Sequence, residues 1–137
     1  MRQLQTAPLA SVFRLAGWIG VLIIAVLSLV PGAERPHTGA PSQIEHYVAY
    51  LLVGFVLALG YVQNRSVVTI GLLLTLYAGL LEFAQLFIPG RSARVIDILV
   101  SAMGAWTGIV LAFVFYHRSV IRQRSQPTSF QNHRSIE

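Results

Sequence analysis

The segment from Glu82 to Asp97 combines ionisable side chains with strongly apolar flanking sequence. Between these two carboxylates lie Gln85, Arg91 and Arg94. Charged groups are costly in hydrocarbon, so their presence inside apolar helical sequence indicates a buried polar site. A buried carboxylate can act as a general base, and the planar fork of an arginine suits phosphate and other anionic groups. We interpret the segment as a polar hairpin that joins two spanning helices at one membrane face.

The composition predicts an integral membrane protein. The chain has 137 residues, of which 55% are hydrophobic and 11% are charged, whereas soluble domains carry about 25% charged residues. All ten basic residues are arginine, and they lie in loops and tails around apolar blocks. That pattern is typical of positive-inside anchoring and not of a nucleic-acid-binding face, so we expect no nucleic-acid partner. The absence of cysteine excludes disulfides and thiolate chemistry.

Four apolar segments position this hairpin, and each is long enough to cross a hydrocarbon core of about 30 Å. The predicted helices cover 14–30, 44–63, 67–88 and 95–116. Together they form one membrane domain, 14–116, between a polar arm, 1–13, and a basic tail, 117–137, that we expect to be disordered. The first segment is predicted to be retained and not cleaved as a signal peptide, because no small-x-small cleavage pair precedes Glu34.

Turn residues separate the four helices. The proline- and glycine-rich stretch 31–43 is predicted to be a loop. Ser42 and Glu45 have the spacing of a capping box, with Ser42 as N-cap and Glu45 reaching back. The polar residues 64–66 predict a tight turn whose last residue caps the third helix, and the Pro-Gly pair at 89–90 ends that helix.

The arginines also predict the orientation. With four spans, seven arginines share a side with both termini and three lie on the other side. The arginine-rich side belongs in the cytoplasm. The predicted fold is therefore an all-α membrane protein, a four-helix transmembrane bundle with both termini cytoplasmic, and the 89–94 loop faces outward.

Helical periodicity places the polar groups on faces that also carry small residues, as in Gly104-x3-Gly108. These faces pack against other helices, so the polar groups are expected to point into the bundle. The residues expected to converge in an outward-facing vestibule, with Arg91 and Arg94 above them, are His46, Tyr50, Glu82, Gln85, Asp97 and Ser101.

These residues resemble the VanZ-like family of small bacterial membrane proteins. The resemblance covers roughly residues 15–115 and is carried by Tyr77-x4-Glu82-x2-Gln85-x-Phe87-x-Pro89-Gly90-Arg91-x5-Asp97, with Gly104-x3-Gly108, Ser28-x2-Pro31 and His46-x3-Tyr50-x3-Gly54. Where the family commonly has Asp-Lys before the histidine, this chain has Ser42 and Gln43, and Ser101 stands where the family commonly has asparagine. The entrance to the site is therefore less charged than the family pattern.

The family is named after a protein linked to resistance to teicoplanin, a cell-wall-directed glycopeptide antibiotic. The resemblance implies a role in the bacterial cell envelope and a place in the cytoplasmic membrane. It names no reaction and no cofactor, and we expect no cofactor.

Each candidate residue also has a structural interpretation. Glu82 can be a functional acid or can simply hydrogen-bond within the bundle, and Asp97 suits the first turn of a helix. Arg91 can pair with Glu82 or Asp97, or can bind an anionic head group. His46 is most simply a hydrogen-bonded structural residue. A metal site formed by His46, Glu82 and Asp97 requires three distant helices to converge around a single histidine, so we predict no metal.

Three hypotheses about function remain. The leading one is a binding protein for a lipid head group, a lipid-linked cell-wall precursor or a glycopeptide antibiotic, in which Arg91 meets the anionic group and Glu82, Gln85, Asp97, His46 and Tyr50 complete the site. The second is a membrane hydrolase or transferase that acts on a lipid-linked substrate, with Glu82 or His46 as general base. The third is a structural or assembly subunit of an envelope complex. The sequence sets no oligomeric state.

Overall fold

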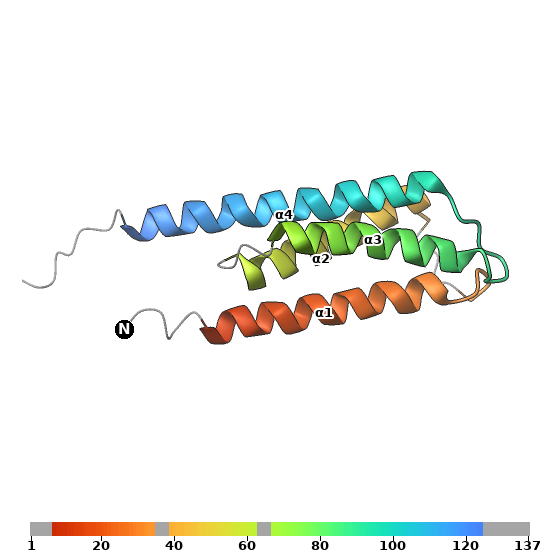
Figure 1. Cartoon of the computed structure of the whole chain (residues 1–137), viewed down its shortest axis with the longest axis horizontal. Coiled ribbons are helices and arrows are strands. Elements are labelled where there is room, and N and C mark those ends of the chain that lie inside the picture. The colour runs from red at the N-terminus through yellow and green to blue at the C-terminus, as the bar shows by residue number, and fades with distance from the viewer. Residues whose placement is uncertain (1–6, 35–38, 63–66, 125–137) are drawn as a thin grey trace, which may run out of the picture.

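The computed structural model describes residues 7–34, 39–62 and 67–124, with side chains described for 9–34, 39–62 and 67–121. These residues form four helices, which are α1 (Ala7–Leu29), α2 (Ser42–Tyr61), α3 (Val67–Gln85) and α4 (Val95–Arg124). The helices lie side by side along one long axis (Figure 1). Each is long and apolar enough to cross a membrane, which confirms the four predicted spans.

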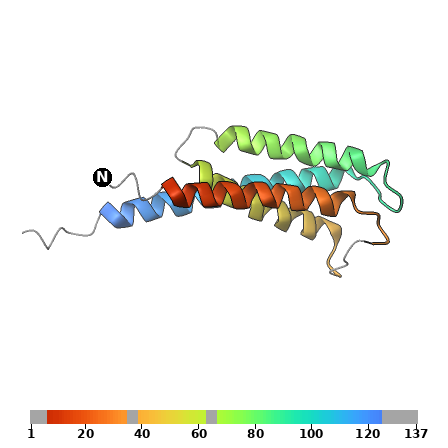
Figure 2. The same cartoon turned by 90° about the horizontal axis from the view of Figure 1, so that it is seen from below.

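The two ends of the bundle differ in what they contain. The start of α1 and the end of α4 lie at one end, as Figures 1 and 2 show. The loops that follow α1 and α3 meet at the other end, beside the start of α2. We call this second end, which contains residues 30–34 and 86–94, the loop end. All of the predicted site residues lie on helix termini or loops at the loop end or within a few turns of it.

Helix boundaries differ from the prediction at α3 and α4. Helix α3 ends at Gln85, because Leu86, Phe87 and Ile88 each donate a backbone hydrogen bond to the carbonyl three residues earlier, at 3.2, 3.1 and 3.1 Å. This tighter turn brings the chain to Pro89. Helix α4 continues through 117–124, part of the predicted tail, because no glycine or proline interrupts that segment. The predicted turn at 64–66 and the tail beyond Arg124 lie outside the described residues.

The predicted capping box at the start of α2 is wrong. Ser42 is the first helical residue, and the N-cap is Pro41, with no side-chain cap hydrogen bond. The Pro41 carbonyl instead accepts backbone hydrogen bonds from Ile44 at 2.9 Å and from Glu45 at 3.3 Å. The helix thus begins one residue earlier than the capping box requires, and the Ser42 hydroxyl comes one position too late to cap it.

Glycines on α4 let α2 and α4 approach closely, as their spacing predicts. A Cβ atom on Gly104 would collide with the carbonyl oxygen of Tyr47, and one on Gly108 would collide with the carbonyl oxygen of Leu51. The two helices therefore pack backbone against backbone. The hydroxyl of Tyr47 also donates a 3.2 Å hydrogen bond to the hydroxyl of Thr107 across this interface.

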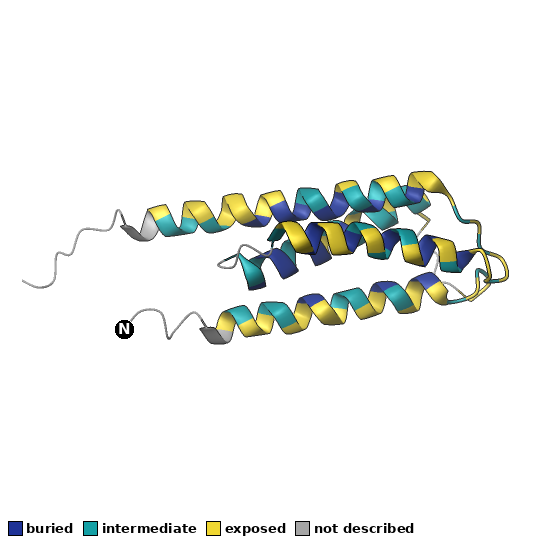
Figure 3. Ribbon diagram, in the orientation of Figure 1, coloured by how far each residue is buried: buried dark blue, intermediate teal, exposed yellow. Residues whose placement is uncertain are grey.

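Helix α1 packs on α2 and α3 and, among the described residues, makes no contact with α4. Among the side chains of α1 that the structure describes, Ile24 is the one buried apolar side chain of the core, and most of the large ones point outward. Figure 3 shows the same division along every helix, with buried residues facing the interior and exposed ones facing out. The outward faces are apolar, as a membrane-spanning bundle requires. Helix α1 is thus the most peripheral of the four.

A backbone contact joins the two loops at the loop end. The N–H of Gly32, after α1, donates a 3.2 Å hydrogen bond to the carbonyl of Pro89, after α3. The next residue, Gly90, has a φ of +74°, a conformation that a residue with a side chain rarely adopts. A Cβ atom on Gly32 would also collide with the Gly90 carbonyl oxygen. Both glycines are therefore required for the two loops to meet.

Candidate functional site

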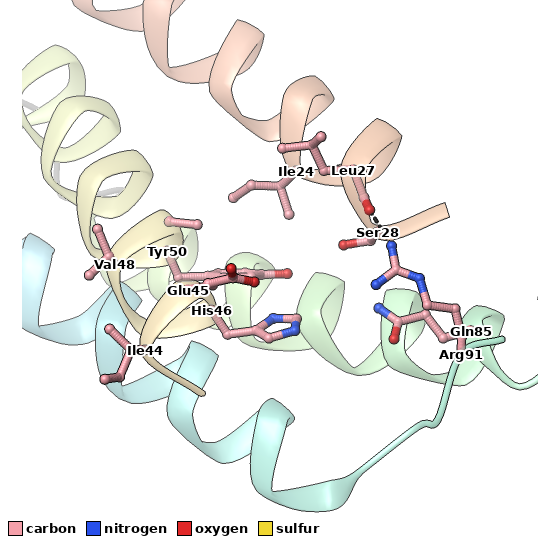
Figure 4. A pocket seen from close by; sticks show the side chains of 11 residues that line it. Ile24, Leu27, Ser28, Ile44, Glu45, His46, Val48, Tyr50, Gln85 and Arg91 are labelled. Carbon is pink, nitrogen blue, oxygen red and sulfur yellow. Dashed lines mark hydrogen bonds between the residues drawn. The ribbon is translucent and has the colours of Figure 1, made fainter. Parts of the chain in front are cut away.

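A cavity of about 500 Å³ lies between the end of α1 and the start of α2, as Figure 4 shows. Most of its wall is apolar, but a histidine, a glutamine and an arginine lie on the side nearest the loop end. The lining residues are Ile24, Leu27, Ser28, Ile44, Glu45, His46, Val48, Ala49, Tyr50, Gln85 and Arg91. Its volume and its mixture of many apolar groups with a few polar ones are typical of a small-molecule site.

A second, smaller cavity of about 150 Å³ adjoins the first at the loop end. Its wall is mainly polar and includes both arginines of the hairpin. The lining residues are Gly32, Ser42, His46, Gln85, Gly90, Arg91, Ser92, Arg94 and Asp97. His46, Gln85 and Arg91 line both cavities. The two cavities are thus neighbours, with the apolar one inside the bundle and the polar one under the loops.

Arg91 holds the end of α1. Its Nε donates a 3.0 Å hydrogen bond to the carbonyl of Val30, and its guanidinium also donates to the carbonyl of Leu27 (Figure 4). These carbonyls belong to the last turn of α1 and the residue after it, where carbonyl groups have no partner within the helix. A cation is also favoured at this negative end of the helix dipole. Arg91 therefore connects the hairpin to α1 while it faces both cavities.

Glu82 holds the start of α4. Its side chain is only 4% exposed, and Oε1 accepts a 2.5 Å hydrogen bond from the backbone N–H of Arg94. Arg94 directly precedes Val95, the first residue of α4, so this N–H is one that the helix itself cannot satisfy. A carboxylate is also favoured at the positive end of a helix dipole. Glu82 thus ties the last turn of α3 to the first turn of α4.

Asp97 and His46 lie beside Glu82. Asp97, in the first turn of α4, is 4% exposed, and among the described residues its buried Oδ1 has no hydrogen-bond partner. One potential ligand atom from each of His46, Glu82 and Asp97 lies within 4.8 Å of the other two. Nδ1 of His46 lies 3.4 Å from the hydroxyl oxygen of the buried Ser101, one turn along α4 from Asp97. Three helices therefore bring one imidazole and two carboxylates together.

The structure brings all six residues of the predicted ligand-binding set to the loop end. His46, Tyr50, Gln85 and Arg91 line the larger cavity and Asp97 lines the smaller one. Glu82 does not line either cavity and lies against His46 and Asp97 instead. The side chains of Tyr50 and Gln85 are 2% and 4% exposed, so they face the interior as the helical periodicity predicts. Arg94, predicted to lie above the site, lines its polar part.

Comparison with known families decides the identity of the chain. The family model VanZ/LLP1 matches residues 8–116. The chain belongs to this family. Searches of curated proteins and of solved structures find no match. With its four apolar helices, this VanZ/LLP1 chain is a multi-pass membrane protein. The match confirms the resemblance drawn from the residues around Glu82 and Arg91.

Two residues of the VanZ/LLP1 bundle make contacts that the sequence does not predict. Ser28, in the last turn of α1, is 8% exposed and lines the larger cavity. The sequence feature that points to Ser28 is its spacing before Pro31, which is part of the pattern shared with the family. At the other end of the bundle, Nε of Arg14 donates a 2.7 Å hydrogen bond to the carbonyl of Gly60, and the guanidinium lies over the ring of Tyr61 at 4.6 Å. No motif marks Arg14.

Proposed function

We propose that this protein binds an amphiphile with an anionic head group in the bacterial cytoplasmic membrane, with the site facing outward and both termini in the cytoplasm. A phospholipid or a lipid-linked cell-wall precursor has this chemistry. The observation that carries the proposal is the adjacency of the two cavities, because an apolar cavity of about 500 Å³ shares three lining residues with a polar one that two arginines line. A family link to teicoplanin resistance is consistent with a ligand of the cell envelope.

The wall of the larger cavity supports entry of the ligand from the membrane. Leu27, Ile44 and Val48 line the cavity and are 45%, 54% and 45% exposed. They lie on the outer surfaces of α1 and α2, so the cavity opens between these helices toward the lipid. An acyl or prenyl chain can therefore enter sideways and bury its apolar surface without crossing water.

The polar part supports recognition of an anion. Arg91 and Arg94 face the smaller cavity together with Ser42, Ser92 and the amide of Gln85. Guanidinium groups bind phosphate through paired, charge-assisted hydrogen bonds. The carbonyls of α1 orient the guanidinium of Arg91, and this side chain lines both cavities. We expect the head group between these two arginines.

The test measures which lipids remain bound to the purified full-length chain. The protein is equilibrated in detergent with phosphatidylglycerol or with phosphatidylcholine, and the bound lipid is counted by native mass spectrometry. We expect phosphatidylglycerol to bind more tightly. Ala49→Phe fills the larger cavity and should weaken binding by about tenfold or more, equivalent to about 1.4 kcal/mol. Ala16→Phe, on the exposed face of α1, is the matched control and should bind normally.

A second pair of variants tests the head-group site. Arg94→Gln should reduce the preference for phosphatidylglycerol over phosphatidylcholine, whereas Arg118→Gln, exposed on α4 far from the loop end, should leave it unchanged. Equal binding of both lipids by the wild-type chain, or an unchanged lipid count in Ala49→Phe, would refute the proposal. The same measurement with a prenyl phosphate in place of phosphatidylglycerol distinguishes the two ligand classes, because tighter binding of the prenyl phosphate indicates a cell-wall carrier and tighter binding of phosphatidylglycerol indicates a bulk phospholipid.

The two other hypotheses predict different results. A hydrolase or transferase would turn over a lipid-linked substrate and would lose turnover, with binding retained, in Glu82→Gln. The hydrogen bond from Arg94 to Glu82 Oε1 favours a positioning role for this carboxylate over that of a general base. For an assembly subunit, Glu82→Gln or Asp97→Asn would lower protein abundance and would have no separate effect on lipid binding.

A further inference from the structure

We infer that His46, Glu82 and Asp97 form a binding site for a divalent transition-metal ion such as Zn²⁺. The three residues belong to α2, α3 and α4, and none is adjacent to another in sequence. The inference concerns a cation in the bundle itself and does not depend on the lipid ligand proposed above.

The geometry of the three side chains is close to that of a metal site. Their potential ligand atoms all lie within 4.8 Å of one another. Atoms that bind the same tetrahedral Zn²⁺ at about 2.0–2.1 Å lie about 3.4 Å apart. Side-chain adjustments of less than about 1 Å would therefore bring all three within bonding distance of one ion.

The unpartnered oxygen of Asp97 is the observation that points to a cation. Asp97 is 96% buried, and its Oδ1 has no hydrogen-bond partner in the described part of the chain. A buried carboxylate oxygen without a partner is strongly unfavourable. A second buried carboxylate, that of Glu82, lies beside it and adds repulsion between like charges. A divalent ion between the two carboxylates would neutralise both charges and satisfy Oδ1.

Neighbouring groups hold the other two side chains in place. Oε1 of Glu82 accepts the backbone hydrogen bond from Arg94, and the carboxylate has a second oxygen to offer. Nδ1 of His46 lies 3.4 Å from the hydroxyl of Ser101, and one nitrogen of the imidazole is among the three clustered ligand atoms. Histidines that bind metals commonly use one ring nitrogen for the ion while the other is oriented by a hydrogen bond. Ser101 therefore fits the role of a positioning residue.

The types of ligand restrict the kind of ion. Imidazole favours Zn²⁺, Fe²⁺ and Cu²⁺, whereas Mg²⁺ and Ca²⁺ prefer sites made of oxygen alone. Three protein ligands with no fourth leave a position open, as in sites where the ion also binds water or a ligand. Asp97 and His46 both line the smaller cavity, so that open position would face the space beside Arg91 and Arg94. An ion held there could also bind an anionic group.

The experiment measures metal binding directly. The full-length chain, prepared without a polyhistidine tag, is stripped with a chelator in detergent and titrated with Zn²⁺, and separately with Mn²⁺. Bound metal is measured by elemental analysis after desalting. We expect about one Zn²⁺ per chain and a rise in the unfolding temperature when it binds. Co²⁺ in place of Zn²⁺ should give visible absorption bands that report a nitrogen- and oxygen-coordinated ion.

Matched variants separate the site from other histidines and carboxylates. Asp97→Asn and His46→Gln should each weaken Zn²⁺ binding by at least about tenfold and remove the rise in unfolding temperature. Glu34→Gln, exposed in the loop after α1, and His117→Gln, exposed on α4, are the controls and should bind as the wild type does. If Asp97→Asn does not fold, His46→Gln, on the less buried side of the cluster, carries the test.

Two outcomes would overturn the inference. One is a stripped wild-type chain that takes up neither Zn²⁺ nor Mn²⁺. The other is uptake that persists in both Asp97→Asn and His46→Gln, which would place the ion elsewhere. Metal binding without any lipid preference would leave this inference standing while the proposed function fails, so the two can be distinguished.

Discussion

The carboxylate of Glu82 accepts a 2.5 Å hydrogen bond from the backbone N–H of Arg94. Glu82 lies in the last turn of α3 and Arg94 directly precedes α4, so a single side chain links the two helices across the hairpin. Glu82→Ala should lower the stability of the bundle by about 1–3 kcal/mol, because a buried N–H loses its partner. Glu82→Gln should cost less, since its amide oxygen can still accept. Thermal unfolding in detergent measures both, with Glu34→Ala, an exposed loop carboxylate, as control, and equal losses for the two Glu82 variants would contradict the assignment.

Arg91 stabilises the C-terminal turn of α1 through the carbonyls of Leu27 and Val30. Arg91→Ala should therefore reduce stability by about 1–3 kcal/mol in addition to any loss of ligand. Arg91→Lys keeps the charge but loses the fork, so we expect an intermediate loss. Arg94→Ala, whose side chain is exposed, should stay within about 0.5 kcal/mol of the wild type. A wild-type unfolding temperature in Arg91→Ala would show that these two hydrogen bonds do not contribute.

Two glycines in this bundle predict opposite responses to the same substitution. At Gly104 a Cβ atom would meet the Tyr47 carbonyl oxygen, so Gly104→Ala should destabilise the α2–α4 interface by about 1–3 kcal/mol. At Gly79 nothing lies within 4 Å of such an atom, and Gly79→Ala should stabilise α3 by up to about 1 kcal/mol. The unfolding temperatures of the two variants, compared in the same detergent, check the prediction. A decrease of similar size in both would argue against close packing at Gly104.

The orientation of the chain can be measured because it contains no cysteine. Glu34→Cys and Ser92→Cys place a thiol in each loop at the loop end, and Ser119→Cys places one near the other end of α4. In intact cells, a membrane-impermeant maleimide should label the first two and not the third. The reverse pattern would place the loop end in the cytoplasm and would remove the basis for an outward-facing site.

The helical parts of the site could be predicted because the helical period is regular. On α2, His46, Tyr50, Gly54 and Ala58 follow one face, and the last three of these are buried. On α4, Asp97 and Ser101 share a buried face with Gly104, Gly108 and Ala112. Sequence spacing fixes which side of a helix a residue occupies, and small residues mark the side that meets another helix.

The contacts between elements could not be predicted in the same way. The partners of Arg91 depend on how the 86–94 loop folds back onto α1, which no periodicity describes. The distance from His46 to Asp97 depends on the rotation of α2 against α4, which the glycine contacts set. The sequence alone therefore predicts no metal site, because the convergence of three helices is a property of their packing and not of any one motif.

The close packing of α2 against α4 makes one half of the bundle stiffer than the other. Their backbones meet at Gly104 and Gly108, whereas α1, among the described helices, packs on α2 and α3 alone and forms one wall of the larger cavity. Amide protons along α2 and α4 should thus exchange with deuterated solvent most slowly. A bulky guest would be accommodated by an outward tilt of α1, with Arg91 and the Gly32–Pro89 contact acting as the pivot.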